Sequence, residues 1–298
     1  MLNSAASRSP RSIDGMMRIK GLRFLAGGDS RFGLPNPEQL DTITLDDIRE
    51  WIQPQLSKAP LELSVVGDVD VEQVIDLARR YLGALPRRDR DLEAVRSDLP
   101  TVPTGMTERI AVDTQIPKAM VVAAWQTEDF WDINRTRRLS VLADVFSERL
   151  RQRIREKLGA SYSPYAFNRA SRAYDGYGVF QAYISVSPDQ ADAVLKEVNA
   201  IAARLAIGGI TEDELNRAID PILTSIRELR QTNGYWLNSV MTESTRHPQQ
   251  IEWARSFLDD YAAVTVQELN RLAATYLTKE RAAAIIIRPK EGDLKDEG

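Results

Sequence analysis

The chain has 298 residues, of which 43% are hydrophobic and 28% charged, and its net charge is −4 at pH 7. This composition is typical of a globular protein, and the length favours two core-bearing units over one. The acidic balance argues against a general nucleic-acid-binding protein, which normally presents a basic surface. The chain has no cysteine, so disulfides and thiolate chemistry are excluded.

Membrane association and a secretory signal are not expected. No apolar run approaches the roughly 20 residues that a membrane-spanning helix requires. The first eighteen residues are rich in Ser and Arg and have no apolar core of the kind that a signal peptide needs. The sequence is compatible with either a periplasmic or a cytoplasmic location.

The first predicted helix covers residues 44–57, where Thr44 and Asp47 form a capping pair ahead of apolar residues at helical spacing. Leu61–Val66 is predicted to form a buried strand, because it is a short apolar run that ends in a Gly-Asp turn. A second amphipathic helix is predicted over residues 71–82.

A polar, proline-punctuated linker is predicted at residues 91–105, and strands and helices alternate beyond it. Strands are predicted within residues 110–125, 161–187 and 282–287. The second of these regions is rich in Tyr and Phe, and glycines mark a turn inside it. Apolar residues at helical spacing predict helices at residues 139–158, 194–205, 211–229, 235–244, 248–261 and 265–277.

The end of the chain repeats a pattern from its beginning. A shift of 221 residues without a gap pairs Thr44 with Thr265, and the register holds across helix, loop and strand. Such register favours a duplication, although two unrelated helix–strand units are an alternative because capping boxes are common. On the first interpretation, residues 13–90 are the C-terminal part of one domain and residues 106–290 are a complete copy.

The chain lacks the residues that a catalytic metal site or a nucleophilic catalytic site requires. A catalytic zinc ion takes three protein ligands, usually with histidine among them, and the chain has a single histidine, His247. We therefore predict no metal site and no cofactor-binding residues in this chain. The segment Gly159–Ser163 lacks the second glycine of a nucleophile elbow, and one histidine leaves little scope for a catalytic triad.

Arg155 and Tyr162 stand out at the junction where a helical pattern ends at Gly159 and aromatic, strand-like sequence begins. A guanidinium and a phenol at the end of one element can converge on a single ligand oxygen, which is the geometry for holding a peptide carbonyl or the oxyanion that it becomes. Spacing alone also allows a structural role. An arginine near a helix C-terminus stabilises the helix, because its positive charge interacts favourably with the negative end of the helix dipole. A tyrosine in a strand is commonly a packing residue.

The string from Leu150 to Tyr165 resembles the Arg/Tyr element in the C-terminal half of insulinase/pitrilysin-type zinc metallopeptidases (inverzincins), particularly the large bacterial members. The similarity extends in order along nearly the whole chain, from about Gly27 to Pro289. Its further segments are Gly28–Gly33, Val65–Asp68, Tyr81–Pro86, Leu139–Tyr165 and Thr232–Leu237.

The resemblance implies an α+β fold, with a mixed, largely antiparallel sheet and helices packed on one face. Such peptidases have four homologous domains in two halves that close around a substrate. The first domain carries zinc and the last carries the Arg/Tyr pair. This chain matches the end of the third domain and all of the fourth, with Arg155 and Tyr162 at the positions of the catalytic pair.

The implied function is the substrate-binding, non-zinc half of a zinc metalloendopeptidase, with a peptide or unfolded protein as substrate. Zinc is then expected in the missing N-terminal half of the parent, a zinc-bearing homologous partner, and this chain alone is expected to be inactive. The alternative is a catalytically inactive assembly or peptide-binding protein with the same fold. An upstream His-x-x-Glu-His helix in the parent gene would distinguish the two.

Overall fold

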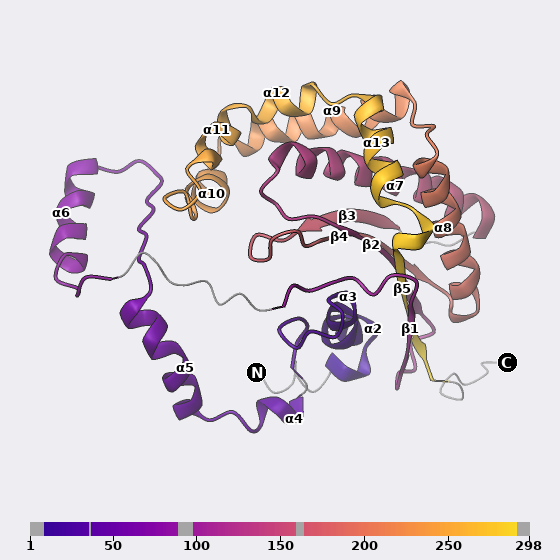
Figure 1. Cartoon of the computed structure of the whole chain (residues 1–298), viewed down its shortest axis with the longest axis horizontal. Coiled ribbons are helices and arrows are strands. Elements are labelled where there is room, and N and C mark those ends of the chain that lie inside the picture. Colours follow the sequence, from indigo (N-terminus) through magenta and orange to yellow (C-terminus); the bar gives the residue numbers. More distant parts are fainter. Residues whose placement is uncertain (1–8, 36, 89–97, 159–163, 291–298) are drawn as a thin grey trace. The chain divides into compact units, whose positions relative to one another are not determined.

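The computed structural model describes residues 9–35, 37–88, 98–158 and 164–290, and its elements are drawn in Figure 1. The chain divides into two compact units. Unit 1 consists of residues 1–40, 98–220 and 260–298, and unit 2 consists of residues 41–97 and 221–259.

A five-stranded mixed sheet forms the centre of unit 1, with its strands in the order β1-β5-β2-β4-β3. The pair β1 and β5 is parallel, whereas β5–β2, β2–β4 and β4–β3 are antiparallel. The fold expected from the resemblance, a mixed and largely antiparallel sheet with helices, is therefore confirmed. The strands are β1 (Thr107–Val112), β2 (Ala119–Thr127), β3 (Tyr165–Ala170), β4 (Gly178–Val186) and β5 (Ala282–Pro289).

Three long helices cover one face of this sheet. They are α7 (Ile133–Leu158), α8 (Ala191–Ala206) and α13 (Val266–Tyr276). The core between helix and sheet is centred on Trp125, Phe146 and Phe180, which are fully buried. The Trp125 ring lies 5.8 Å from the Phe146 ring and 6.2 Å from the Phe180 ring, both edge-on. Aromatic pairs at these separations add to the free energy gained by burial.

The opposite face of the sheet is partly covered by the N-terminal segment. Met16, Met17 and Leu25 share a buried cluster with Val122 and Ile285, side chains of the two central strands. Burial of this apolar surface holds the segment on the sheet. The segment consists of η1 (Ser9–Arg11), α2 (Ile13–Met16), a π-helical turn η2 (Met17–Gly21), α3 (Leu22–Leu25) and, farther along, α4 (Pro37–Leu40).

Unit 2 contains α5 (Leu45–Lys58) and α6 (Val71–Leu82), together with the helices near residue 240. A small core forms around Tyr235, Val240 and Ala254. The remaining elements of the chain are η3 (Pro188–Gln190), α9 (Glu212–Leu229), α10 (Asn233–Tyr235), η4 (Trp236–Met241), α11 (Gln249–Arg255), α12 (Phe257–Ala262) and η5 (Lys279–Arg281). Among the described residues, no helix is long and apolar enough to cross a membrane.

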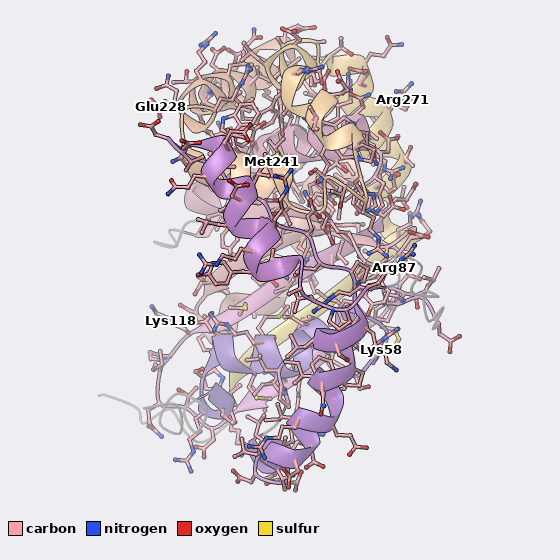
Figure 2. The ribbon with its side chains drawn as sticks, turned by 90° about the vertical axis from the view of Figure 1, so that its left-hand side faces the viewer. Lys58, Arg87, Lys118, Glu228, Met241 and Arg271 are labelled. Carbon is pink, nitrogen blue, oxygen red and sulfur yellow. The ribbon has the colours of Figure 1, made fainter. Side chains whose placement is uncertain are left out.

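The prediction of a buried strand at Leu61–Val66 was wrong. The segment has no regular secondary structure and pairs with no strand in the described chain, and Leu61 and Leu63 are exposed. The flanking helices α5 and α6 bury none of their side chains, so the segment has no core to join. Glu62 instead accepts hydrogen bonds from the Ser244 hydroxyl and the Thr245 amide. Figure 2 shows Lys58, where α5 ends ahead of this segment.

The two helices related by the 221-residue shift begin in the same way. Thr44 caps α5 with Asp47, and Thr265 caps α13 with Glu268, each through a reciprocal capping box. The segments that follow differ, because β5 is a central strand whereas residues 61–66 are unpaired. The assignment of residues 13–90 and 106–290 to two related domains stays a prediction.

Candidate binding groove

The helix–strand junction singled out in the sequence is formed by α7, which ends at Leu158, and β3, which begins at Tyr165. The backbone of Arg155 lies in the last turn of α7. The side chain of Arg155 and the whole of Tyr162 lie outside the described residues, so the geometry of this pair stays a prediction.

Ser147 fastens α7 to β3 close to this junction. The Ser147 hydroxyl accepts a 2.8 Å hydrogen bond from the Ala166 amide and donates a 2.7 Å bond to the Ala143 carbonyl. Both Ser147 and Ala166 are buried. A buried amide without a partner is costly, so the hydroxyl fixes where the strand starts beside the helix.

Three near-parallel aromatic rings stack against one another on the face of the sheet that α7 does not cover. Tyr165 and Phe167 come from alternate positions of β3, and Tyr183 lies opposite Tyr165 on β4. The ring centroids are 5.6 Å apart for Tyr165–Tyr183, 6.0 Å for Tyr165–Phe167 and 5.6 Å for Phe167–Tyr183, with interplanar angles of 13° to 24°. We call these three residues the aromatic platform.

The platform differs in exposure from one ring to the next. Tyr165 is 51% exposed, whereas Tyr183 is partly buried and its hydroxyl donates a 3.1 Å hydrogen bond to buried Gln181. Burial raises the pKa of Tyr183 well above its usual range, so this phenol stays protonated at physiological pH. The platform therefore offers the exposed ring of Tyr165, supported by the more buried rings of Phe167 and Tyr183.

A cavity of about 590 Å³ separates the platform from the N-terminal segment. Met17, Leu22 and Leu34 of the N-terminal segment line one side, and the platform with Met120 lines the other. A second cavity of about 410 Å³ shares Asp14, Met120, Tyr165 and Tyr183 with the first and extends to Lys118 and Ile116. The two adjoining cavities form one groove, which we call the platform groove. Lys118, labelled in Figure 2, lies directly before β2.

Charged side chains stand along the groove. Arg18, Arg169 and Asp14 line the larger cavity, and all three are exposed. Neither arginine forms an ion pair with a residue in the part of the chain that the structure describes. The larger cavity therefore combines apolar walls with an excess of positive charge.

The N-terminal wall of the groove is held by the loop Gly28–Gly33. The Phe32 ring lies 5.5 Å from both Tyr174 and Tyr177, in the hairpin between β3 and β4. Gly33 has φ of 78°, and a Cβ there would lie 2.6 Å from the Ile19 carbonyl oxygen. Only glycine accommodates both conditions, so this loop depends on glycine at position 33.

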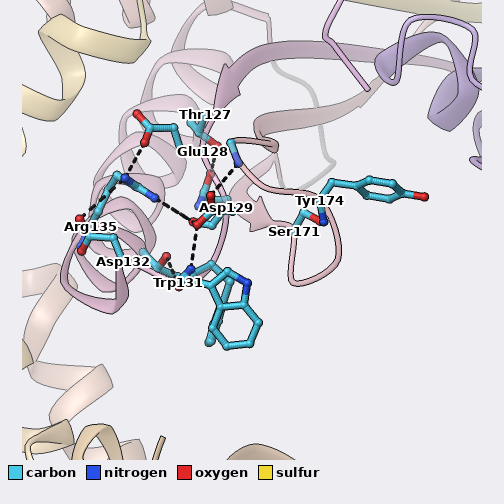
Figure 3. A network of polar contacts seen from close by, with 12 residues as sticks. Thr127, Glu128, Asp129, Trp131, Asp132, Arg135, Ser171 and Tyr174 are labelled. Carbon is cyan, nitrogen blue, oxygen red and sulfur yellow. Dashed lines mark hydrogen bonds and ion pairs between the residues drawn. The ribbon is translucent and has the colours of Figure 1, made fainter. Parts of the chain in front are cut away.

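The β3–β4 hairpin is also held by a polar network (Figure 3). Asp129 accepts a 2.6 Å hydrogen bond from the Gly176 amide, and Thr127 donates a 2.8 Å bond to Asn168 on β3. Arg135 on α7 forms ion pairs with Glu128 and Asp129. These bonds join the β2–α7 connection to the hairpin, so the strands that carry the platform are rigidly supported.

The described residues contain no group of three or more His, Cys, Asp or Glu side chains that could hold a metal ion. His247, the single histidine, belongs to unit 2. The residues present therefore do not fit a catalytic zinc ion, which needs three converging protein ligands.

The platform groove was not predicted as a site from the sequence. The alternating order of Tyr165, Phe167 and Arg169 carried a partial signal, because alternate residues of a strand point to one face. The approach of Arg18 from the N-terminal segment had no sequence signal, since it depends on which segment covers that face.

Comparison with known proteins identifies the family. The family model described as "Peptidase M16 inactive domain" matches residues 42–222, more than half of the chain. Among curated proteins, the chain is similar to an uncharacterized zinc protease of Streptomyces coelicolor, with 26% identity over 279 residues. The match covers 90% of this chain and 58% of the relative, so this chain spans little more than half of the relative's length.

Two solved structures share the fold. A protease from Helicobacter pylori has a TM-score of 0.79 at 17% identity, covering 96% of this chain and 70% of that one. A peptidase M16 inactive domain from Pseudomonas fluorescens has a TM-score of 0.77 at 16% identity, covering 97% of this chain and 70% of that one. The resemblance to insulinase/pitrilysin-type peptidases is thereby confirmed, and the chain belongs to the family of peptidase M16 inactive domains.

Proposed function

We propose that this chain is the substrate-binding, non-zinc half of a zinc metalloendopeptidase. The observation that carries the proposal is the platform groove, which opens beside the helix–strand junction of Arg155 and Tyr162. Tyr165, the third residue after Tyr162, lines both cavities of the groove. A peptide held there would lie along the start of β3, the strand that follows the proposed catalytic pair in the sequence.

In this proposal, Arg155 and Tyr162 donate hydrogen bonds to the substrate carbonyl, and these bonds strengthen as the oxygen gains negative charge. Donors aimed at a developing oxyanion lower the barrier because the transition state binds them more tightly than the ground state does. A zinc-bearing homologous half supplies the metal, since the described residues of this chain do not fit one.

The same proposal assigns residues 13–90 to the C-terminal part of one domain, the third of the four. The apolar side chains of α5 and α6 support it, because helices with one apolar face normally bury that face against a sheet or another helix. In the described structure these faces are uncovered, and Trp51, for example, is 72% exposed.

The test is Tyr162→Phe in the assembled protein that contains both halves. We expect kcat to fall by roughly 10²–10³ with little change in KM, because one transition-state hydrogen bond is lost. Tyr81→Phe is the matched control: it removes the same hydroxyl from an exposed tyrosine of α6 and should leave kcat unchanged.

A melting temperature that falls while kcat stays constant would assign Tyr162 a structural role and defeat the proposal. An assembly that binds peptides without hydrolysing any, although its other half carries a His-x-x-Glu-His helix, would favour the inactive assembly or peptide-binding protein instead.

A further inference from the structure

We propose that the platform groove is a specificity pocket for one large apolar side chain, preferably aromatic, of an extended peptide that has an acidic residue beside it. The inference rests on the proposed function, because it names the class of substrate that the chain would hold. It adds Tyr165, Arg18 and Arg169 as residues that select this substrate.

The shape of the groove suits an aromatic side chain. Its larger cavity, of about 590 Å³, is large enough for a phenylalanine side chain together with part of the peptide backbone. The platform rings are stacked within 24° of one another, and the Tyr165 ring is 51% exposed. A fourth ring can pack against the exposed Tyr165 ring at the separations that aromatic pairs prefer.

The charge of the groove selects the neighbouring residue. Arg18 on the N-terminal segment and Arg169 on β3 outnumber Asp14, the acidic residue of the larger cavity. Lys118 adds further positive charge in the adjoining cavity. A guanidinium binds a carboxylate through two parallel hydrogen bonds, so an Asp or Glu next to the apolar side chain would find a matching partner.

The occupant is expected to be an extended chain held by its side chains. The groove continues from the larger cavity into the smaller one past Tyr165 and Tyr183, a path that suits several consecutive residues. Although β3 is an edge strand, the Ala166 amide is already bonded to Ser147, which blocks the addition of another strand at that position.

Peptide binding to this chain, measured by fluorescence anisotropy, tests the inference. The probe is a fluorescein-labelled, ten-residue peptide rich in Ala and Ser that contains one Phe-Glu pair. Its comparison peptides carry Ala-Glu or Phe-Lys in place of the pair. We expect saturable binding of the Phe-Glu peptide and at least tenfold weaker binding of both comparison peptides.

The variants test the contribution of the aromatic ring and that of the positive charge to peptide binding separately. Tyr165→Ala should weaken binding of the Phe-Glu peptide by about tenfold, because a stacking surface is lost, whereas Tyr165→Phe should retain it. Arg169→Glu should reverse the preference toward the Phe-Lys peptide. The controls are Tyr81→Ala and Arg271→Glu, which change exposed residues that do not line the groove and should leave the dissociation constants unchanged.

Absence of saturable binding would overturn the inference, as would equal losses in the groove variants and their controls, or an Arg169→Glu variant that keeps its preference for Glu. The result is independent of the Tyr162→Phe test. Binding to this chain needs no zinc-bearing half, and a groove that binds the peptide is compatible with a Tyr162 that has no effect on kcat.

Discussion

Replacement of Ser147 by alanine should destabilise unit 1 by about 2 kcal/mol. Ser147 and Ala166 are 4% and 8% exposed, so water cannot replace the lost partner of the Ala166 amide. A buried donor left unpaired costs about 1–3 kcal/mol. The Ala143 carbonyl also loses its bond from the hydroxyl, but it remains inside helix α7, where the backbone ladder supplies a donor.

Urea unfolding followed by tryptophan fluorescence measures this loss, because Trp125 is fully buried in the same unit. About 2 kcal/mol corresponds to a fall in melting temperature of roughly 4–8 °C for a cooperative unit of this size. Hydrogen exchange at the Ala166 amide should also become faster, since the start of β3 loses its tie to α7.

Thr275→Ala is the matched control, because the Thr275 hydroxyl donates a 2.8 Å bond to the Arg271 carbonyl within α13 and is exposed. Its loss should change the unfolding free energy by less than about 0.5 kcal/mol. A Ser147→Ala protein as stable as the wild type, with unchanged exchange at Ala166, would refute the view that this hydroxyl fixes the junction.

Ion pairing, capping and burial give three more predictions. Hydrogen bonds from Arg149 lower the pKa of Glu214 from 4.5 to about 2, so this pair should stabilise the fold above pH 4.5 and lose that contribution as the pH falls toward 2. In the Glu214→Gln protein, the free energy of unfolding measured by urea titration should depend less on pH over this range. An unchanged pH dependence would contradict the prediction. Thr265→Ala removes a capping box and should cost about 1 kcal/mol of unfolding free energy, whereas an unaltered urea midpoint would show that the cap contributes nothing. Trp125→Ala should lower the free energy of unfolding by about 3–5 kcal/mol, whereas Trp51→Ala should lower it by less than about 0.5 kcal/mol because Trp51 is 72% exposed. Similar losses at both positions would mean that Trp51 is buried in solution.

Local sequence patterns were sufficient for most helices and strands. The Thr-Leu-Asp-Asp and Thr-Val-Gln-Glu starts of α5 and α13 specify capping boxes, because the cap residue and its partner lie within one turn. The apolar stripe of α7 likewise identified the side chains that it buries against the sheet, Phe146 and Leu150 among them. Such signals depend only on residues close in sequence.

The strand predicted at Leu61–Val66 shows where local information ends. Its residues favour a strand as those of β5 do, but β5 lies between β1 and β2 and is almost entirely buried. A strand needs partners for its backbone amides and carbonyls, and those partners come from elsewhere in the fold. Without them in the described chain, the segment forms no strand and stays largely exposed.

The sequence by itself determined the family and the order of most helices and strands beyond the predicted linker, and it indicated the candidate pair Arg155 and Tyr162. Only the tertiary structure brought Arg18 of the N-terminal segment opposite the aromatic platform and left a groove between them. Alternation along β3 tells which side chains share a face of the sheet, because successive residues point to opposite sides. Which distant segment covers that face, and where it leaves the face open, is decided by the packing of apolar surfaces far apart in the sequence, and no local pattern records it.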